Sequence, residues 1–161
     1  MFNEPAPAND YLLPHAECLL RSYRLRTGRE LMETGLSARE SAQCLYFAPF
    51  ALLSHDNAPD PLFTYANLAA QAWFEMAWDE IVGLPSRLSA EPMAREARAQ
   101  LLEKVAAHGF VDNYQGVRIA KSGRRFRIEH ATIWNIADSA GLLIGQAAMF
   151  YRGKIPGDLA E

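Results

Sequence analysis

The sequence predicts an α+β domain, in which a five-stranded antiparallel sheet carries helices on one face and is preceded by two N-terminal helices. Three observations lead to this fold class. Helical patterns come before the first β-rich segment, a pair of β-rich segments ends at residue 66, and three longer ones follow Gly109. Short joints containing glycine connect the last three segments, which is typical of an antiparallel meander. A single sheet with helices accommodates this order.

Two helices are predicted before the first strand. Residues 12–27 carry an apolar stripe and end at Gly28. The second helix, over residues 38–48, begins with Ser-Ala-Arg-Glu, a capping box that satisfies free backbone N–H groups. We therefore assign residues 12–48 to an N-terminal helical segment packed on the core. Residues 1–11, which are acidic and proline-rich, are predicted to form a flexible tail.

Two short strands and two helices follow. Residues 50–54 and 62–66 are predicted to form a hairpin across a polar turn. Asn67 is then placed as the N-cap of a helix over residues 68–76, because its side chain can accept from backbone N–H groups of the first turn. Residues 92–108 form the clearest helical pattern in the chain.

The last three β-rich segments complete the sheet. They cover residues 110–120, 125–137 and 142–151 and are joined by Lys-Ser-Gly-Arg and Asp-Ser-Ala-Gly. These joints predict turns between antiparallel neighbours. The core domain is therefore expected to span residues 49–153, with a C-terminal tail over residues 154–161.

The composition is that of a globular protein. The chain has 161 residues, of which 50% are hydrophobic and 22% charged, with a net charge of −3. This length suits one domain with its own core. Both signs of charge are interspersed, so no overall attraction to nucleic acid or to an anionic membrane is expected. The N-terminus lacks a signal-peptide pattern, and no apolar run is long enough to span a bilayer. We therefore expect no membrane partner and a cytoplasmic location.

Motifs that carry chemistry are absent from the sequence. The only cysteines, Cys18 and Cys44, belong to no CxxC or Cys/His cluster, so neither a disulfide framework nor a metal site is indicated. Ser54-His55-Asp56 contains the residue types of a catalytic triad, but neighbours in a strand point to opposite faces. No catalytic residue is assigned, and we expect no enzymatic activity.

A cluster of basic residues surrounds the predicted turn at residues 121–124. Its members are Arg118, Lys121, Arg124, Arg125 and Arg127. A basic hairpin of this kind could contact nucleic acid phosphates. However, Glu129 follows on the same strand face and exposed aromatic residues are not interleaved with the arginines. A solvated strand face or a partner-docking patch is the preferred interpretation, and direct nucleic acid binding is not expected.

The order of elements resembles that of a PAS domain, and several segments are similar to the MEKHLA domain, a PAS-like module, over about residues 15–151. The segments are FALLSHD (50–56), PLFTYAN (61–67), WDEIVGLPSRLSAEP (78–92), YQGVRIAKSGRRF (114–126) and IWNIADSAGLLIGQAAMF (133–150). Similar domains occur alone in bacteria and at the end of class III homeodomain–leucine-zipper plant transcription factors. The resemblance implies sensing or protein association, and it supplies no catalytic residue.

The resemblance also bears on cofactors. Flavin-binding light sensors of this fold carry an Asn-Cys pair before the long helix, whereas the matching segment here is PSRLSAEP, without cysteine. Those sensors also have a glutamine in the last strand. Gln146 follows Gly145 directly instead of after one intervening residue, and a shift of one residue reverses the strand face. The cofactor is therefore unassigned, covalent flavin is not expected, and a non-covalent small aromatic or apolar ligand is the alternative.

The candidate ligand-pocket residues are Trp73, Phe126, His130, Trp134 and Gln146. Even-numbered residues of the strand 125–137 share one face, and its apolar members predict that this face points inward with His130 among them. The alternative for His130 is a core histidine bonded to a backbone carbonyl, or one exposed through a bulge. For Trp134 the alternative is core packing, and for Gln146 it is a structural hydrogen bond. Trp73 either closes a cavity or belongs to a helix packed tightly on the sheet.

These observations leave three hypotheses. The first is a non-catalytic PAS-like sensory or small-molecule-binding module, which signals through another protein or through self-association because no output domain accompanies it. The second is a ligand-free interaction module that forms a homodimer through the helices at residues 12–27 and 38–48. The third, a small α+β enzyme, requires an acidic partner for His130 that the sequence does not identify.

Overall fold

The computed structural model describes residues 3–91 and 95–153. The helices are η1 (Pro7–Leu12), α1 (Leu13–Thr27), α2 (Ala38–Tyr46), α3 (Leu68–Phe74), α4 (Trp78–Ile81), η2 (Ser86–Ser89) and α5 (Arg95–His108). The strands are β1 (Ala51–Asp56), β2 (Phe63–Ala66), β3 (Phe110–Ile119), β4 (Arg125–Ala137) and β5 (Leu143–Gly153).

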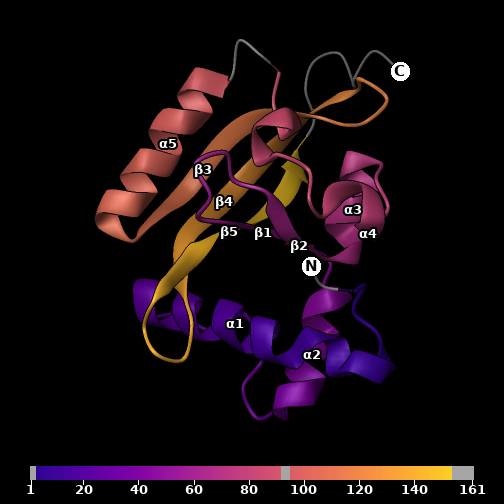
Figure 1. The fold of residues 1–161 in the computed structure, drawn as a ribbon, viewed down its shortest axis with the longest axis vertical. Coiled ribbons are helices and arrows are strands. Elements are labelled where there is room, and N and C mark those ends of the chain that lie inside the picture. Colours follow the sequence, from indigo (N-terminus) through magenta and orange to yellow (C-terminus); the bar gives the residue numbers. More distant parts are fainter. Residues whose placement is uncertain (1–2, 92–94, 154–161) are drawn as a thin grey trace.

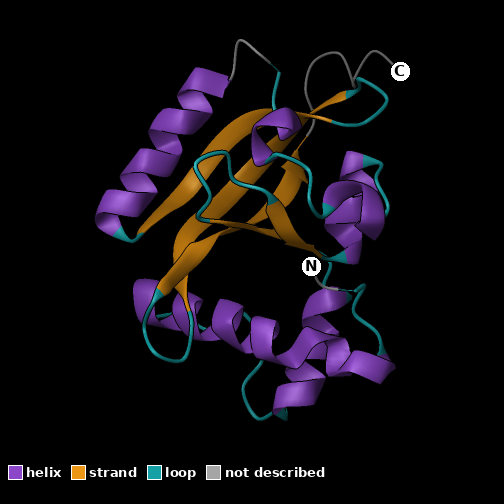
Figure 2. Ribbon diagram, viewed as in Figure 1, coloured by secondary structure: helices purple, strands orange, loops and turns teal. Residues whose placement is uncertain are grey.

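The five strands form one antiparallel sheet in the order β2-β1-β5-β4-β3 (Figure 2). The predicted fold class is therefore confirmed. β1 and β2 form the expected hairpin, and β3, β4 and β5 form the meander. Because β5 returns to pair with β1, the last strand lies in the middle of the sheet with a neighbour on each side.

Helices pack on both faces of the sheet. In Figure 1, α1 and α2 lie below the sheet, α5 lies on the left, and α3 and α4 lie together on the right. On one face, α1 places the Tyr23 ring 5.0 Å from that of Trp134 on β4. It also places His15 Nε2 2.9 Å from Ser54 Oγ on β1. On the other face lie α3 and α5. The cavity described below forms on this second face, so we call it the inner face.

The first residues differ from the predicted tail over residues 1–11. Residues 7–12 form the 3-10 helix η1, and the Tyr11 side chain is buried against α2 and its C-terminal end, with its ring 6.0 Å from that of Phe47. Tyr46 Oη donates to Glu4 Oε2 at 2.7 Å. Burial of the Tyr11 ring therefore holds the segment on the helical layer. The C-terminal tail predicted over residues 154–161 lies outside the described residues.

Asn67 joins three elements at the start of α3. The prediction of an N-cap is confirmed, because Asn67 Oδ1 accepts from the Ala70 N–H at 3.1 Å. The same oxygen accepts from the Leu52 N–H at 2.9 Å. Asn67 Nδ2 donates to the carbonyls of Leu45 at 3.2 Å and Phe50 at 2.8 Å. A single buried amide thus ties α3 to β1 and to the end of α2.

Candidate functional site

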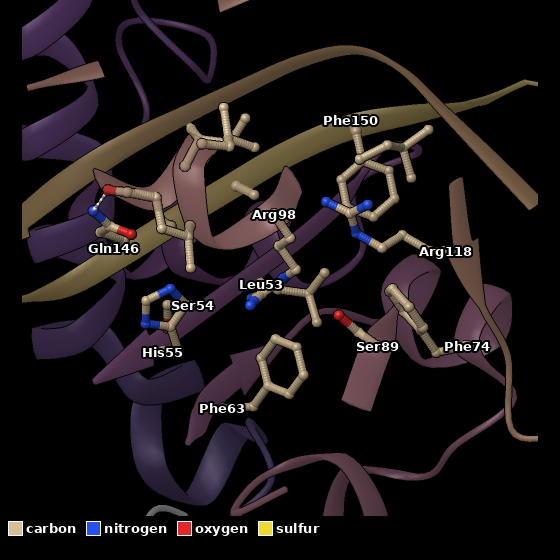
Figure 3. A pocket seen from close by; sticks show the side chains of 16 residues that line it. Leu53, Ser54, His55, Phe63, Phe74, Ser89, Arg98, Arg118, Gln146 and Phe150 are labelled. Carbon is tan, nitrogen blue, oxygen red and sulfur yellow. Dashed lines mark hydrogen bonds between the residues drawn. The ribbon is translucent and has the colours of Figure 1, made fainter. Parts of the chain in front are cut away.

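A cavity of about 50 Å³ lies between the inner face of the sheet, α3, η2 and α5 (Figure 3). Its walls are mostly apolar, but polar side chains reach it from five elements, with Ser89 of η2 among them. The lining residues include His55, Arg98, Leu101, Arg118, Ile133 and Gln146. A mostly apolar cavity with a few convergent polar groups is the usual form of a small-molecule site.

Gln146 faces this cavity from the central strand β5. Its Nε2 donates to the Leu102 carbonyl of α5 at 3.1 Å and to Asn135 Oδ1 at 3.2 Å. Because Gln146 follows Gly145 directly, the sequence predicts that its side chain lies on the reversed strand face. The structure instead places it on the inner face. Both amide hydrogens have partners, so the structural role weighed from sequence is present, and a ligand-binding role stays a prediction.

His55 lies opposite Gln146 in the β1–β5 register and also lines the cavity. Its Nδ1 is 2.8 Å from the Asp56 carbonyl, which can only accept, so Nδ1 carries the hydrogen. Its Nε2 is then a buried acceptor, and no partner for it is found in the described part of the chain. Burial and, to a lesser extent, the charge of Arg98 lower the pKa of His55. The imidazole is therefore neutral near pH 7.

Ser54, the neighbour of His55, points to the other face of the sheet. Its Oγ is 2.9 Å from His15 Nε2 on α1 and 2.8 Å from Thr64 Oγ1 on β2. The expectation that Ser54 and His55 point apart is thus confirmed.

Arg98 reaches the cavity from α5. Arg98, Leu101 and Val105 are the buried residues of that helix, and their spacing places them on one face. Only 9% of Arg98 is exposed. Burial, followed by the nearby charge of Arg118, lowers the pKa of Arg98 to about 10. This value leaves the guanidinium protonated at neutral pH.

Arg118 enters the cavity from β3, on the inner face. The sequence placed it in the basic cluster around residues 121–124, but only 8% of it is exposed. Its Nη1 donates to the Val117 carbonyl at 2.9 Å, and its guanidinium lies 5.9 Å from the centre of the Tyr114 ring. Burial lowers the pKa of Arg118, an effect that Tyr114 partly offsets.

Gly116 makes this position possible for Arg118. A Cβ atom at residue 116 would lie 2.9 Å from the Tyr114 hydroxyl and 3.1 Å from Arg118 Nη1. The missing side chain therefore leaves the space in which Tyr114 and Arg118 approach each other. The apolar Val117 is instead 37% exposed. In β3 the charged residue is therefore buried and its apolar neighbour is exposed, which is the reverse of what the residue types predict.

The inward position predicted for His130 is wrong. The pairing of β4 with β5 shifts between Glu129 and Thr132, and His130 sits in this bulge with a left-handed φ of 51°. Its side chain is exposed, with Nδ1 3.3 Å from Asn113 Oδ1. A bulge adds one residue and reverses the faces that follow. The alternative weighed from sequence, exposure through a bulge, is what the structure has.

The same bulge moves Trp134 away from the cavity. Ile128 before the bulge and Ile133 after it both line the cavity, although their numbers differ in parity. Trp134 therefore lies on the opposite face, fully buried against Tyr23 of α1. The inward position predicted for Trp134 is therefore wrong as well, and core packing is its role in the structure.

Phe126 and Trp73 lie behind the cavity wall. Phe126 is fully buried, with its ring 5.0 Å from that of Phe74, which lines the cavity. Trp73 is half-buried, 6.0 Å from the ring of Phe150, another lining residue. Phe126 and Trp73 therefore pack behind residues that line the cavity, and neither reaches the cavity surface.

His130→Ala is expected to change the free energy of unfolding by less than about 0.5 kcal/mol, because the side chain is exposed and leaves no buried group unpaired. Urea denaturation followed by circular dichroism measures this. A loss above about 1.5 kcal/mol would place the imidazole in the core and contradict the bulge geometry.

A flavin does not fit these residues. The free cysteines Cys18 and Cys44 belong to α1 and α2, and neither lines the cavity. The volume of about 50 Å³ is far below the roughly 300 Å³ at which pockets for larger organic ligands begin.

Residues 3–91 and 95–153 contain no group of three or more His, Cys, Asp or Glu side chains that could hold a metal ion. None of the described helices combines the length and apolar character that crossing a bilayer requires.

Three solved structures have a similar fold. A PAS domain from Colwellia psychrerythraea has a TM-score of 0.64 at 14% identity, over 72% of this chain and 96% of that one. A light-oxygen-voltage domain studied with a flavin analogue has a TM-score of 0.60 at 17% identity, over 75% and 90%. The PAS domain of a LuxR-family transcriptional regulator from Burkholderia thailandensis, in complex with ethanol, has a TM-score of 0.54 at 18% identity, over 68% and 94%. The PAS-like fold is thus confirmed.

No curated protein matches the chain in sequence. The family model of the MEKHLA domain matches residues 13–154, nearly the whole chain, and confirms the resemblance. The chain therefore belongs to the MEKHLA domain family and has a PAS-like fold.

Proposed function

We propose that this MEKHLA domain is a non-catalytic sensory module that binds a small molecule between its sheet and α5 and signals through protein association. The observation that carries the proposal is the cavity of about 50 Å³, into which charged and polar side chains project from separate elements. A core built only for stability gains nothing from such groups, since each buried polar atom costs free energy unless it is paired.

The position of the cavity suggests how occupancy would reach a partner. Gln146 lines the cavity, and the next residue, Ala147, pairs in the sheet with Trp134 on the opposite face. Trp134 contacts Tyr23 of α1. A ligand that shifts β5 would therefore also shift the N-terminal helices, whose exposed surface is available to a partner protein.

Native mass spectrometry and an absorption spectrum of the freshly purified protein test the proposal, together with a thermal-shift screen of small metabolites. We expect either an added mass of a small molecule or a raised unfolding midpoint with some compounds of the screen. A bare protein mass, no chromophore and no midpoint change with any compound would contradict ligand binding.

The second candidate is a ligand-free module that forms a homodimer through α1 and α2. It is favoured by two apolar side chains that these helices leave exposed, Leu25 at 74% and Phe47, at the end of α2, at 55%. Sedimentation velocity between about 1 and 100 µM distinguishes it. A concentration-dependent dimer that Leu25→Glu or Phe47→Glu abolishes supports this candidate, and a monomer at every concentration counts against it.

The cytoplasmic location predicted from sequence stays a prediction.

A further inference from the structure

We propose that the ligand of this cavity is a small carboxylic acid in its anionic form, bound by Arg98 and Arg118 and by the apolar wall between them. This inference rests on the proposed function, because it names the chemical class of the ligand for the same cavity. It is carried by two buried positive charges from different elements, α5 and β3, that reach one cavity (Figure 3).

Neither guanidinium has a carboxylate partner among residues 3–91 and 95–153. The ion pairs found there involve six other arginines and one lysine, all with side chains at least 39% exposed. Arg98 and Arg118 are 9% and 8% exposed. Removing a guanidinium from water costs several kcal/mol unless an anion and hydrogen bonds compensate for the lost hydration.

The two charges also act on each other. The charge of Arg118 is the second cause, after burial, of the lowered pKa of Arg98. Arg118 has the Val117 carbonyl and the Tyr114 side chain near it, whereas no hydrogen bond of the Arg98 guanidinium is found in the described residues. One anion between the two side chains would relieve the repulsion and accept from both, as carboxylates do from arginine.

The rest of the wall favours an organic acid over an inorganic anion. Leu53, Phe63, Leu101 and Ile133 line the cavity together with the arginines. These groups would contact a short hydrocarbon chain and gain free energy by burying it. The volume of about 50 Å³ holds a few water-sized groups, hence a ligand of about four to six non-hydrogen atoms.

Propionate and its neutral isostere propionamide are the decisive pair of probes. Thermal unfolding is measured in HEPES at pH 7 and constant ionic strength, with sodium propionate, propionamide, phosphate or nitrate added. Propionate at a hundred times its dissociation constant is expected to raise the midpoint by about 5–10 °C. Propionamide, which lacks the charge, and the two inorganic anions are expected to shift it by less than about 1 °C.

Two substitutions at one position test the role of Arg98. Arg98→Gln and Arg98→Met are each expected to weaken propionate binding by about 10–100-fold in calorimetry, because one charge-assisted contact is lost. Without propionate, Arg98→Met is expected to unfold at the same or a higher temperature than the wild type, because it removes a buried charge and fills similar space. Lys104→Gln is the matched control, since it removes one positive charge from an exposed position of the same helix. It is expected to bind propionate as the wild type does.

The outcomes separate this inference from the proposed function. If neutral compounds bind in the cavity and no carboxylate does, the sensory proposal stands and the carboxylate inference is overturned. It is also overturned if propionate and propionamide shift the midpoint equally, if only phosphate or nitrate does so, or if Arg98→Met and Arg98→Gln bind propionate unchanged. If no small molecule of any class binds, both proposals fail.

Discussion

Replacing Asn67 by alanine is expected to lower the free energy of unfolding by about 3–5 kcal/mol. The N-cap contact alone is worth about 1 kcal/mol. The remainder comes from two buried backbone groups that would lose their partner, the Leu52 N–H and the Phe50 carbonyl. The Leu45 carbonyl would lose one of its partners but still accepts from the Ala48 N–H at 3.4 Å. Each such group costs about 1–3 kcal/mol when it is left unpaired, and water or local rearrangement reduces the sum.

Asn67→Ser separates the cap from the contacts to other elements. A serine is as good an N-cap as asparagine but is too short, and has too few donors, to bond α2 and β1 as well. We expect Asn67→Ser to recover about 1 kcal/mol of the loss seen with alanine. Urea denaturation of both variants, with equal m-values, measures this difference. Recovery of nearly the whole loss would mean that the contacts to Leu45, Phe50 and Leu52 contribute little.

Asn67 illustrates what could be predicted from the sequence. Its role as a cap follows from local rules, because the acceptor and the N–H group are three residues apart. Its bonds to Leu45 and Phe50 join residues 22 and 17 positions apart, and no local pattern predicts them. Likewise the fold class and the strand order of the meander could be predicted, since periodicity and short turns determine them.

The candidate site was harder to predict because its residues depend on a bulge and on a glycine. Strict alternation along residues 125–137 predicted one inward face, but the extra residue at the bulge near His130 exposes that histidine and turns Trp134 outward. Arg118 was placed at the surface because arginine is rarely buried. The signal for Arg98 was present, since it lies three and seven residues before Leu101 and Val105 on the buried face of α5.

The two alternatives for Trp73, closure of a cavity or tight packing of its helix on the sheet, also have a structural answer. Ala70 is fully buried and Phe74 packs on Phe126 and Phe150, so α3 fits closely against the sheet. The cavity lies farther along the inner face, toward α5 and η2. Sequence alone could not decide this, because side-chain volume fills or leaves space only once the helix position is known.

Acidification from pH 6.5 to pH 4 is expected to lower the free energy of unfolding by up to about 3 kcal/mol through His15. Burial on the inside of α1 lowers the pKa of His15 to about 4, from 6.5 in the unfolded chain. Between these values the unfolded state binds a proton that the folded state does not, so stability falls as the pH falls, by about 1.4 kcal/mol per unit at most. His55, whose pKa is also lowered by burial, acts in the same direction.

His15→Gln isolates this contribution. Glutamine keeps a neutral polar group that can reach Ser54, so we expect only a moderate loss of stability at pH 7 and a smaller slope of stability between pH 6.5 and pH 4. His108→Gln, at an exposed position of α5, is the matched control and is expected to keep the wild-type slope. The measurement is the urea midpoint at half-unit steps of pH. If His15→Gln keeps the full acid slope, proton uptake by other groups, including His55, drives the acid response. The buried contact between α1 and the sheet would then play no part in the pH dependence.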